Sequence, residues 1–174
     1  MIRTLFVLFI LFSSLTANAL DLTQIRKEFY AGVNDKDAAE KFYLKLKSQT
    51  LTNPVLQAYY GSAEALMGKH AWNPYKKVSY LKSGLRTLEL AIAKNPESIE
   101  IRFLRFSIEH YLPPFLGLSK NLEEDGKKIV ELIEKDSLST ADSTLVKNIV
   151  NFLKKTNRFS AREVEILNSG IKNG

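Results

Sequence analysis

Cationic and aromatic side chains alternate in one window of the chain. Between Glu64 and Glu89 there is no acidic residue, and the only tryptophan of the sequence lies in that window. Cations placed beside aromatic rings can bind an anionic headgroup or an acidic sugar by charge and by stacking. The candidate anion-binding residues are Lys69, Trp72, Tyr75, Lys76, Lys77, Lys82 and Arg86. The alternative interpretation is a solvated helix face that carries one aromatic plug.

Residue types that usually carry catalysis or bind metals are sparse. The chain has no cysteine and two histidines, His70 and His110, and neither histidine has metal-ligand spacing around it. The segment "NDKD" at 34–37 lacks the glycine and the later glutamate of a calcium loop. The acidic triplet at 123–125 lies in the first turn of an expected helix, where negative charge complements the helix dipole. The sequence therefore predicts no catalytic residue, no metal site and no cofactor, so we expect a protein that is not an enzyme.

The stretch "HYLPPFLG" at 110–117 interrupts a chain that otherwise has helical periodicity. Two adjacent prolines cannot continue a helix, and they favour an extended conformation at Leu112. One interpretation is a packed connector, in which Phe115 and Leu116 fold back over the helix end and Gly117 makes the turn. The other is an apolar lip that borders a groove and helps to grip a partner.

The elements that must position these residues are helices, because strand signals are nearly absent and apolar residues recur with a 3.6-residue period. The clearest helix begins at Asn73-Pro74, carries one apolar stripe from Tyr75 to Ile92, and ends before Pro96. Connections are short and there is no linker, which predicts a single all-α domain over 20–174 with about eight helices in antiparallel pairs. The other helices are expected within 21–33, 37–49, 53–68, 97–112, 121–135, 138–156 and 160–171.

One segment of the chain resembles a tetratricopeptide repeat. The spacing of a second repeat helix is reproduced by Gly84, Leu88, Ala91 and Pro96, and Gly61 with Ala65 is similar to a first helix. The resemblance covers 54–112 and is shared by several exported bacterial proteins. It implies a right-handed helical repeat, and the alternative is an irregular helical bundle. Small residues at these positions would let helix axes approach closely.

The resemblance also implies a concave groove lined by the first helix of each pair. Helical-repeat surfaces of this kind usually hold peptides or protein segments. Phe103 is equally well explained as a core residue. The candidate groove residues are Val55, Ala58, Ser62, Phe103, Ser107 and His110.

The N-terminal residues 1–19 have the pattern of a signal peptide. Arg3 precedes a short apolar run, and Ala17-Asn18-Ala19 forms a small-x-small cleavage pattern. The apolar run is too short to span a bilayer, although a membrane anchor is the alternative interpretation. Absence of cysteine excludes a lipid-modified cysteine. We therefore expect an exported protein that begins at Leu20 and is periplasmic or secreted.

The formal net charge of the chain is +6. An export signal makes a nucleic acid an improbable counterpart for this basic protein. Taken together, the sequence predicts an exported module for protein–protein interaction or assembly in the cell envelope, whose partner is another protein or a peptide segment. The alternative is a binding protein for an anionic envelope component, either a lipid headgroup or an acidic polysaccharide.

Overall fold

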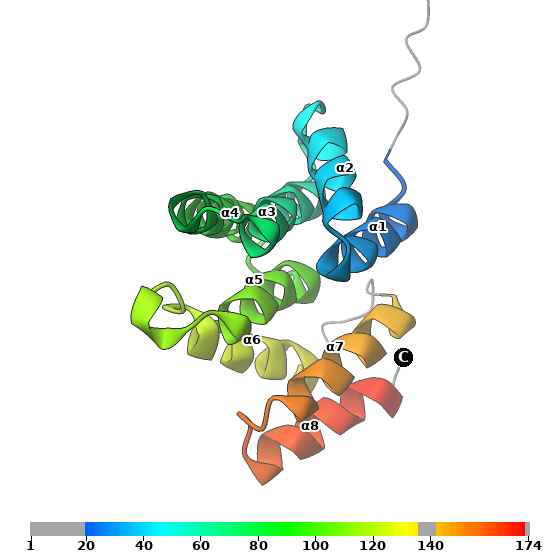
Figure 1. The fold of residues 1–174 in the computed structure, drawn as a ribbon. Helices are drawn as coiled ribbons and strands as arrows, with labels where there is room; N and C mark the ends of the chain where they lie inside the picture. Colours follow the sequence, from blue (N-terminus) through cyan, green and yellow to red (C-terminus); the bar gives the residue numbers. More distant parts are fainter. Residues whose placement is uncertain (1–19, 136–141, 173–174) are drawn as a thin grey trace, which may run out of the picture.

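The computed structural model describes residues 20–135 and 142–172, and this part of the chain is all-helical (Figure 1). It contains eight α-helices and one short 3-10 turn, which confirms the predicted fold class. The expected signal peptide at 1–19 lies outside the described residues. The elements are α1 (Leu22–Asn34), α2 (Lys36–Lys47), α3 (Pro54–His70), α4 (Pro74–Lys94), α5 (Ile99–Tyr111), η1 (Pro114–Leu116), α6 (Leu122–Glu134), α7 (Ser143–Lys155) and α8 (Ala161–Lys172).

The helix starts follow from local sequence. Seven of these helices begin behind a residue whose side chain accepts a hydrogen bond from the first turn, which satisfies amide groups that have no partner within the helix. The predicted Asn-Pro starts of α3 and α4 are confirmed, and so is the capping box of Ser160 and Glu163 at the start of α8. The seven capping residues are Asp21, Asp35, Asn53, Asn73, Ser98, Asp142 and Ser160.

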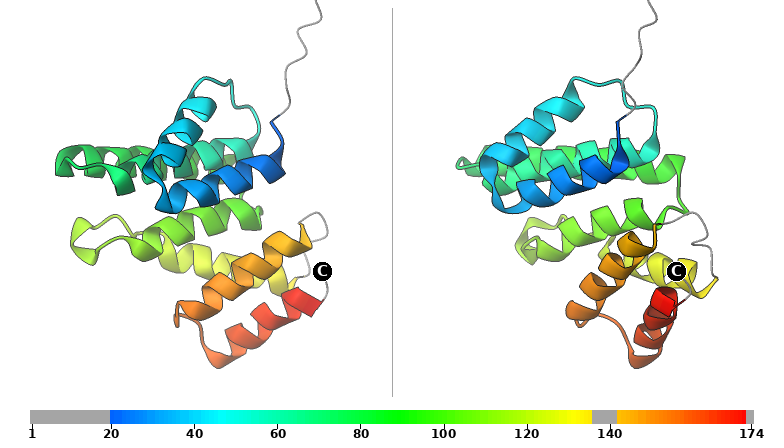
Figure 2. Two further views of the ribbon diagram at one scale, coloured as in Figure 1. Left: turned by 45° about the vertical axis from the view of Figure 1, so that its right-hand side comes forward. Right: turned by 90° about the vertical axis from the view of Figure 1, so that its right-hand side faces the viewer.

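The helices are arranged as four sequential pairs. Helix α1 packs on α2, α3 on α4, α5 on α6 and α7 on α8, while the odd-numbered helices also contact one another in chain order. In both views of Figure 2 the turns inside the first three pairs lie at one end of the molecule. This arrangement is compatible with a helical repeat, and a right-handed tetratricopeptide-like twist remains a prediction.

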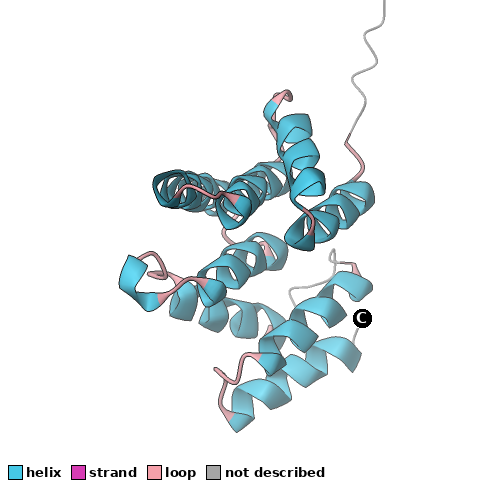
Figure 3. Cartoon of the chain, viewed as in Figure 1, coloured by secondary structure: helices cyan, strands magenta, loops and turns pink. Residues whose placement is uncertain are grey.

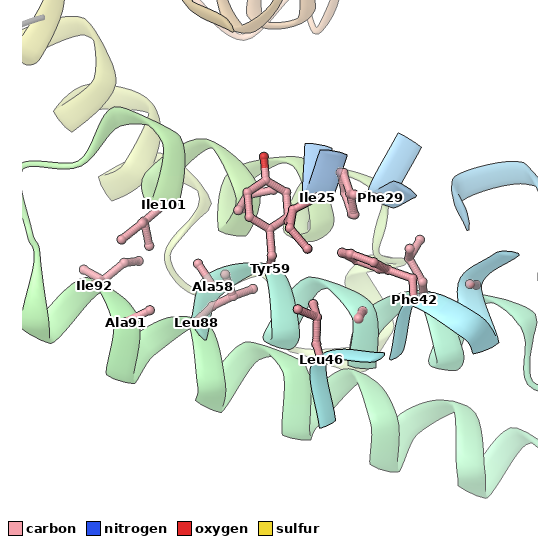
Figure 4. Close-up of a cluster of buried hydrophobic side chains, with 14 residues drawn as sticks. Ile25, Phe29, Phe42, Leu46, Ala58, Tyr59, Leu88, Ala91, Ile92 and Ile101 are labelled. Carbon is pink, nitrogen blue, oxygen red and sulfur yellow. The ribbon is translucent and has the colours of Figure 1, made fainter. Parts of the chain in front are cut away.

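Two apolar cores share helix α5. The first core lies among α1–α5, and Figure 4 shows side chains such as Phe42, Tyr59 and Leu88 meeting there. The second lies among α5–α8. Ile101 of α5 belongs to the first core and Phe106 to the second. Helix α5 is therefore covered on both sides.

Helices α3 and α4 approach each other through two glycines. A Cβ atom added to Gly61 would lie 2.8 Å from the carbonyl oxygen of Gly84, and one added to Gly84 would overlap the carbonyl oxygen of Gly61 and lie 3.0 Å from the amide nitrogen of Ala65. This close approach confirms the reason given for small residues at these positions. Within the described residues, no helix combines the length and apolar composition needed to cross a membrane.

Candidate functional site

The corner between α3 and α4 presents the tryptophan of the chain. Asn73 caps α4, because its side-chain oxygen accepts hydrogen bonds from the amides of Tyr75 at 2.9 Å and Lys76 at 3.2 Å. Pro74 occupies the first position of the helix, where a missing amide hydrogen costs nothing. The backbone of the corner is therefore defined by local chemistry, and Trp72 immediately precedes the cap.

The corner is also tied to the neighbouring helix pair. The ammonium of Lys69 donates to the carbonyl oxygen of Val33, and Nε2 of His70 lies 2.8 Å from the carbonyl oxygen of Gly32. Both carbonyls belong to the last turn of α1, where cationic and polar side chains satisfy free acceptors. Nζ of Lys77 donates to the carbonyl oxygen of Lys69 at 3.3 Å. The ammonium groups of two of the seven candidate anion-binding residues, Lys69 and Lys77, thus donate hydrogen bonds to backbone carbonyls.

The remaining candidates at this corner are open to solvent. Trp72 is 99% exposed and Tyr75 is 86% exposed. Lys76, Lys82 and Arg86 are exposed as well, and their side chains form no hydrogen bond or ion pair with another residue that the structure describes. The exposed surface of α4 therefore carries three positive charges that form no ion pair among the described residues.

The connector between α5 and α6 places a second aromatic side chain in solvent. Leu112 is extended and Gly117 makes the turn, as predicted, and the turn places Gly117 in a left-handed conformation with φ of 60°. Between them, η1 turns Phe115 outward, and this residue is 86% exposed. The expectation that Phe115 folds back over the helix end is wrong, because the 3-10 turn projects its ring away from α5.

The α3–α4 corner and the α5–α6 connector lie at the same end of the molecule in both views of Figure 2, and Figure 3 shows them as loops beyond the helix ends. Among the described residues, the four most exposed large apolar side chains belong to these two segments or to the helix turns beside them. We call this set the aromatic edge: Trp72, Tyr75, Tyr111 and Phe115.

The connector is held closed by Glu109, a residue of α5. Its carboxylate accepts hydrogen bonds from the backbone amide and the side-chain amide of Asn121, at 2.8 and 3.0 Å. Burial raises the pKa of Glu109. Ser119 donates to the backbone carbonyl oxygen of Glu109 at 2.8 Å. The loop from 112 to 121 is therefore closed at its base, while Phe115 remains exposed at its tip.

His110 is engaged by packing and by one hydrogen bond. Its ring stacks on Phe106 at 6.2 Å between centroids, and its Nδ1 accepts a hydrogen bond from Nε of Arg158 at 3.1 Å. Burial, together with the positive charge of Arg158, lowers the pKa of His110. The histidine links the end of α5 to the turn between α7 and α8.

The candidate groove residues lie mainly between helices. Ala58 and Ser62 have no exposed surface, and the hydroxyl of Ser62 donates to the carbonyl oxygen of Ala58 at 2.9 Å. Phe103 is buried in the second core, edge-on to Phe152 at 5.2 Å, so the structure places it as the core interpretation expected. The half-buried candidates are Val55, Ser107 and His110.

Buried ion pairs join segments that are distant in the sequence. Nε and one terminal nitrogen of Arg26 in α1 donate to the two carboxylate oxygens of Glu100 in α5, at 2.8 and 2.9 Å. The hydroxyl of Tyr59 donates to the same carboxylate at 2.7 Å. The loss of solvent on burial, together with the negative charge of Glu100, raises the pKa of Tyr59. Asp142, which caps α7, lies 3.4 Å from Arg26 and extends this network.

A second network centres on Asp125, which is completely buried. Its carboxylate accepts hydrogen bonds from Arg102 at 2.8 Å and from Arg105 at 2.6 and 2.8 Å. The acidic triplet lies in the first turn of α6, as predicted, but the charge of Asp125 is also matched by two guanidinium groups of α5. Sequence analysis missed this role because polar positions on a helix usually indicate a solvent face.

A shallow hollow of about 280 Å³ lies between the end of α2, the segment that follows it and α3, lined in part by Leu46, Leu51 and Tyr60. Beside it, Tyr43 and Tyr60 stack at 5.9 Å between ring centroids. Burial and the nearby charge of Glu64 raise the pKa of Tyr60 to about 12. The Glu64 carboxylate accepts hydrogen bonds from two α4 hydroxyls, at 2.6 and 2.7 Å. The Glu64 carboxylate and the two hydroxyls therefore form hydrogen bonds that join α3 to α4.

No group of three or more histidine, aspartate or glutamate side chains suited to a metal ion occurs in residues 20–135 and 142–172. Comparison with family models, with curated proteins and with solved structures identifies no match to the chain. Among the surfaces described above, the aromatic edge is the most prominent.

Proposed function

We propose that the protein is a non-enzymatic interaction or assembly module that is exported to the cell envelope and docks through its aromatic edge. The observation that supports this function is the exposure of Trp72, at 99%, on a corner whose backbone is defined by a cap and by contacts to α1. Exposed apolar patches of this kind mark interaction sites more often than they serve the fold.

The types of residue on this edge are those that dominate binding energies. Tryptophan and tyrosine are enriched at the centres of interfaces, where their burial contributes a large share of the affinity. A corner that is already ordered loses little conformational entropy when it binds, so more of the contact energy appears as affinity. In this proposal the partner is another protein or a peptide segment of the envelope.

The exposed cations favour a second candidate, which is a binding protein for an anionic envelope component. Lys76, Lys82 and Arg86 have no acidic partner among the described residues, and all are exposed. A surface with unmatched positive charge attracts an anionic counterpart and accelerates its association. This candidate predicts that binding weakens steeply as salt increases.

Crosslinked pull-down from envelope extract tests the proposal. The full chain and the variant Trp72→Ala are used as bait at low and high salt, with Leu44→Ala as the control, because Leu44 is also exposed but lies on α2. A protein recovered in near-stoichiometric amount by the parent and by Leu44→Ala, and lost with Trp72→Ala, supports the interaction module. Equal recovery by all three baits refutes docking through the aromatic edge.

A further inference from the structure

We infer that the aromatic edge docks on the surface of an anionic lipid bilayer. This inference rests on the second candidate of the proposed function, a binding protein for an anionic envelope component, and names a lipid bilayer as that component. It combines two independent observations, the exposed aromatic rings and the local excess of lysine. Stable attachment of a protein to a membrane surface generally needs two signals of this kind, one apolar and one electrostatic.

The aromatic rings fit the boundary between hydrocarbon and water. Tryptophan and tyrosine collect at this level in membrane proteins, because each has an apolar body and one polar group that stays hydrated. Trp72 and Phe115 project from two separate loops at the same end of the molecule (Figure 2). A bilayer can accept both rings side by side without offering a matched pocket for each.

The charges beside the rings complement an anionic surface. The segment 69–77 carries three lysines and no carboxylate, and the segment 110–121 carries one lysine and no carboxylate. Each lysine near an anionic membrane increases the partition constant by a factor of about five. Weak attraction by the lysines and insertion of the rings therefore reinforce each other.

Three of the acidic groups near this end of the molecule are already engaged, whereas Asp37 in the first turn of α2 is exposed. Asp35 accepts hydrogen bonds from the amides of Asp37 and Ala38 at the start of α2. Glu123 pairs with Lys127 at 2.7 Å and Glu124 with Arg102 at 2.8 Å. These carboxylates are partly neutralised by their own partners, so they oppose a negative surface less than free carboxylates would.

If this end of the molecule docks on the membrane, the contribution of each cation of α4 to membrane affinity should decrease with its distance from the α3–α4 corner. With a rise of about 1.5 Å per residue, Lys82 lies about 9 Å and Arg86 about 15 Å further from the corner than Lys76. Electrostatic attraction decays over about 8 Å at physiological salt. Lys76→Gln should therefore weaken binding about fivefold, Lys82→Gln less, and Arg86→Gln hardly at all. Equal effects of the three changes would overturn docking by this end.

The single tryptophan provides the measurement. The full chain, expressed with its own N-terminal segment and with its N-terminus determined by mass spectrometry, is titrated with phosphatidylcholine vesicles with and without phosphatidylglycerol. We expect the emission of Trp72 to move to shorter wavelength only with the anionic vesicles. Lipids brominated on the acyl chain should quench this emission, because the ring enters the boundary of the hydrocarbon region. An emission unchanged by anionic vesicles overturns the inference.

Matched variants separate the edge from the rest of the surface. Phe115→Ser should weaken vesicle binding at least tenfold, whereas Leu44→Ser, which removes an exposed apolar side chain from α2, should leave it unchanged. Lys147→Gln, an exposed lysine of α7, is the control for charge. Because every variant keeps the same N-terminal segment, differences among them report on the edge.

The vesicle assay and the pull-down distinguish the two proposals. If vesicles have no effect but a protein partner is still lost with Trp72→Ala, the membrane inference fails and the interaction module stands. If Phe115→Ser leaves vesicle binding unchanged and Trp72→Ala leaves the pull-down unchanged, both proposals fail. If Phe115→Ser and Leu44→Ser weaken vesicle binding equally, the attachment is non-specific and the inference is overturned.

Discussion

Replacement of Asp125 by asparagine tests the buried network of α5 and α6. The change is nearly isosteric, so it leaves no cavity, but it removes the charge that faces Arg102 and Arg105. It also places an amide nitrogen opposite a guanidinium donor, because the two carboxylate oxygens accept from different groups. The side chains of the two arginines are only 9% and 4% exposed, so neither charge can recover full hydration.

The expected loss is large. Removing one partner from a buried ion pair generally costs about 3–5 kcal/mol, since the remaining charge stays buried. Domains of this size have a total stability of about 5–15 kcal/mol. With a urea dependence of about 2 kcal/mol per molar, Asp125→Asn should lower the unfolding midpoint by about 1.5–2.5 M.

Urea unfolding followed by far-ultraviolet circular dichroism is the appropriate assay. Tryptophan emission is unsuitable, because Trp72 is fully exposed in the folded state and changes little on unfolding. The control is Glu123→Gln, in the same helical turn, whose side chain is 83% exposed and pairs with Lys127. We expect the control to keep the parent midpoint. Equal midpoints for the two variants would refute the reasoning that burial gives Asp125 its importance.

Three further outcomes follow from contacts described above. Gly84→Ala should destabilise the protein by about 1–3 kcal/mol in the same assay, because the added methyl group overlaps the carbonyl oxygen of Gly61, and this outweighs the better helix propensity of alanine. Stability measured at intervals below pH 7 should show a decline that His110→Gln reduces. The pKa of His110 is lowered from its ordinary 6.5, so the unfolded chain takes up its proton first, and the stability present above 6.5 is lost as the pH falls. Tyr59→Phe should cost about 1.5 kcal/mol by removing the hydroxyl that donates to Glu100, and a stability equal to the parent would contradict that role.

Much of the architecture could be predicted because it depends on neighbouring residues. Asn73-Pro74 specifies a helix start through a cap and a fixed backbone angle, and Gly117 marks a left-handed turn. Periodic apolar residues identify each helix in the same local way. Which side of a helix stays exposed to solvent could not be predicted in this way, because it depends on helices that are distant in the sequence. Phe103 therefore could be assigned equally to a groove or to a core before its contact with Phe152 was known.

The charged residues of α5 illustrate the same limit. Glu100 and Arg105 occupy positions that would face solvent on a surface helix, yet both are buried. Their partners, Arg26 and Asp125, lie 74 and 20 residues away in the sequence, and nothing in the local pattern identifies them. The sequence placed Trp72 in a basic window, but the exposure of its ring depends on the backbone conformation of the α3–α4 corner.

Helix α5 belongs to both apolar cores, and this has a consequence for how the molecule folds and for how it could change. If the first two helix pairs were separated from the last two, only one of the two parts could keep a complete core, because α5 contributes side chains to both cores. We therefore expect one cooperative transition on heating and the slowest amide hydrogen exchange in α5. For the same reason, a cut in the chain on either side of α5 should leave one fragment with an unsealed core, whereas residues can be added at the outer pairs without disturbing the seal.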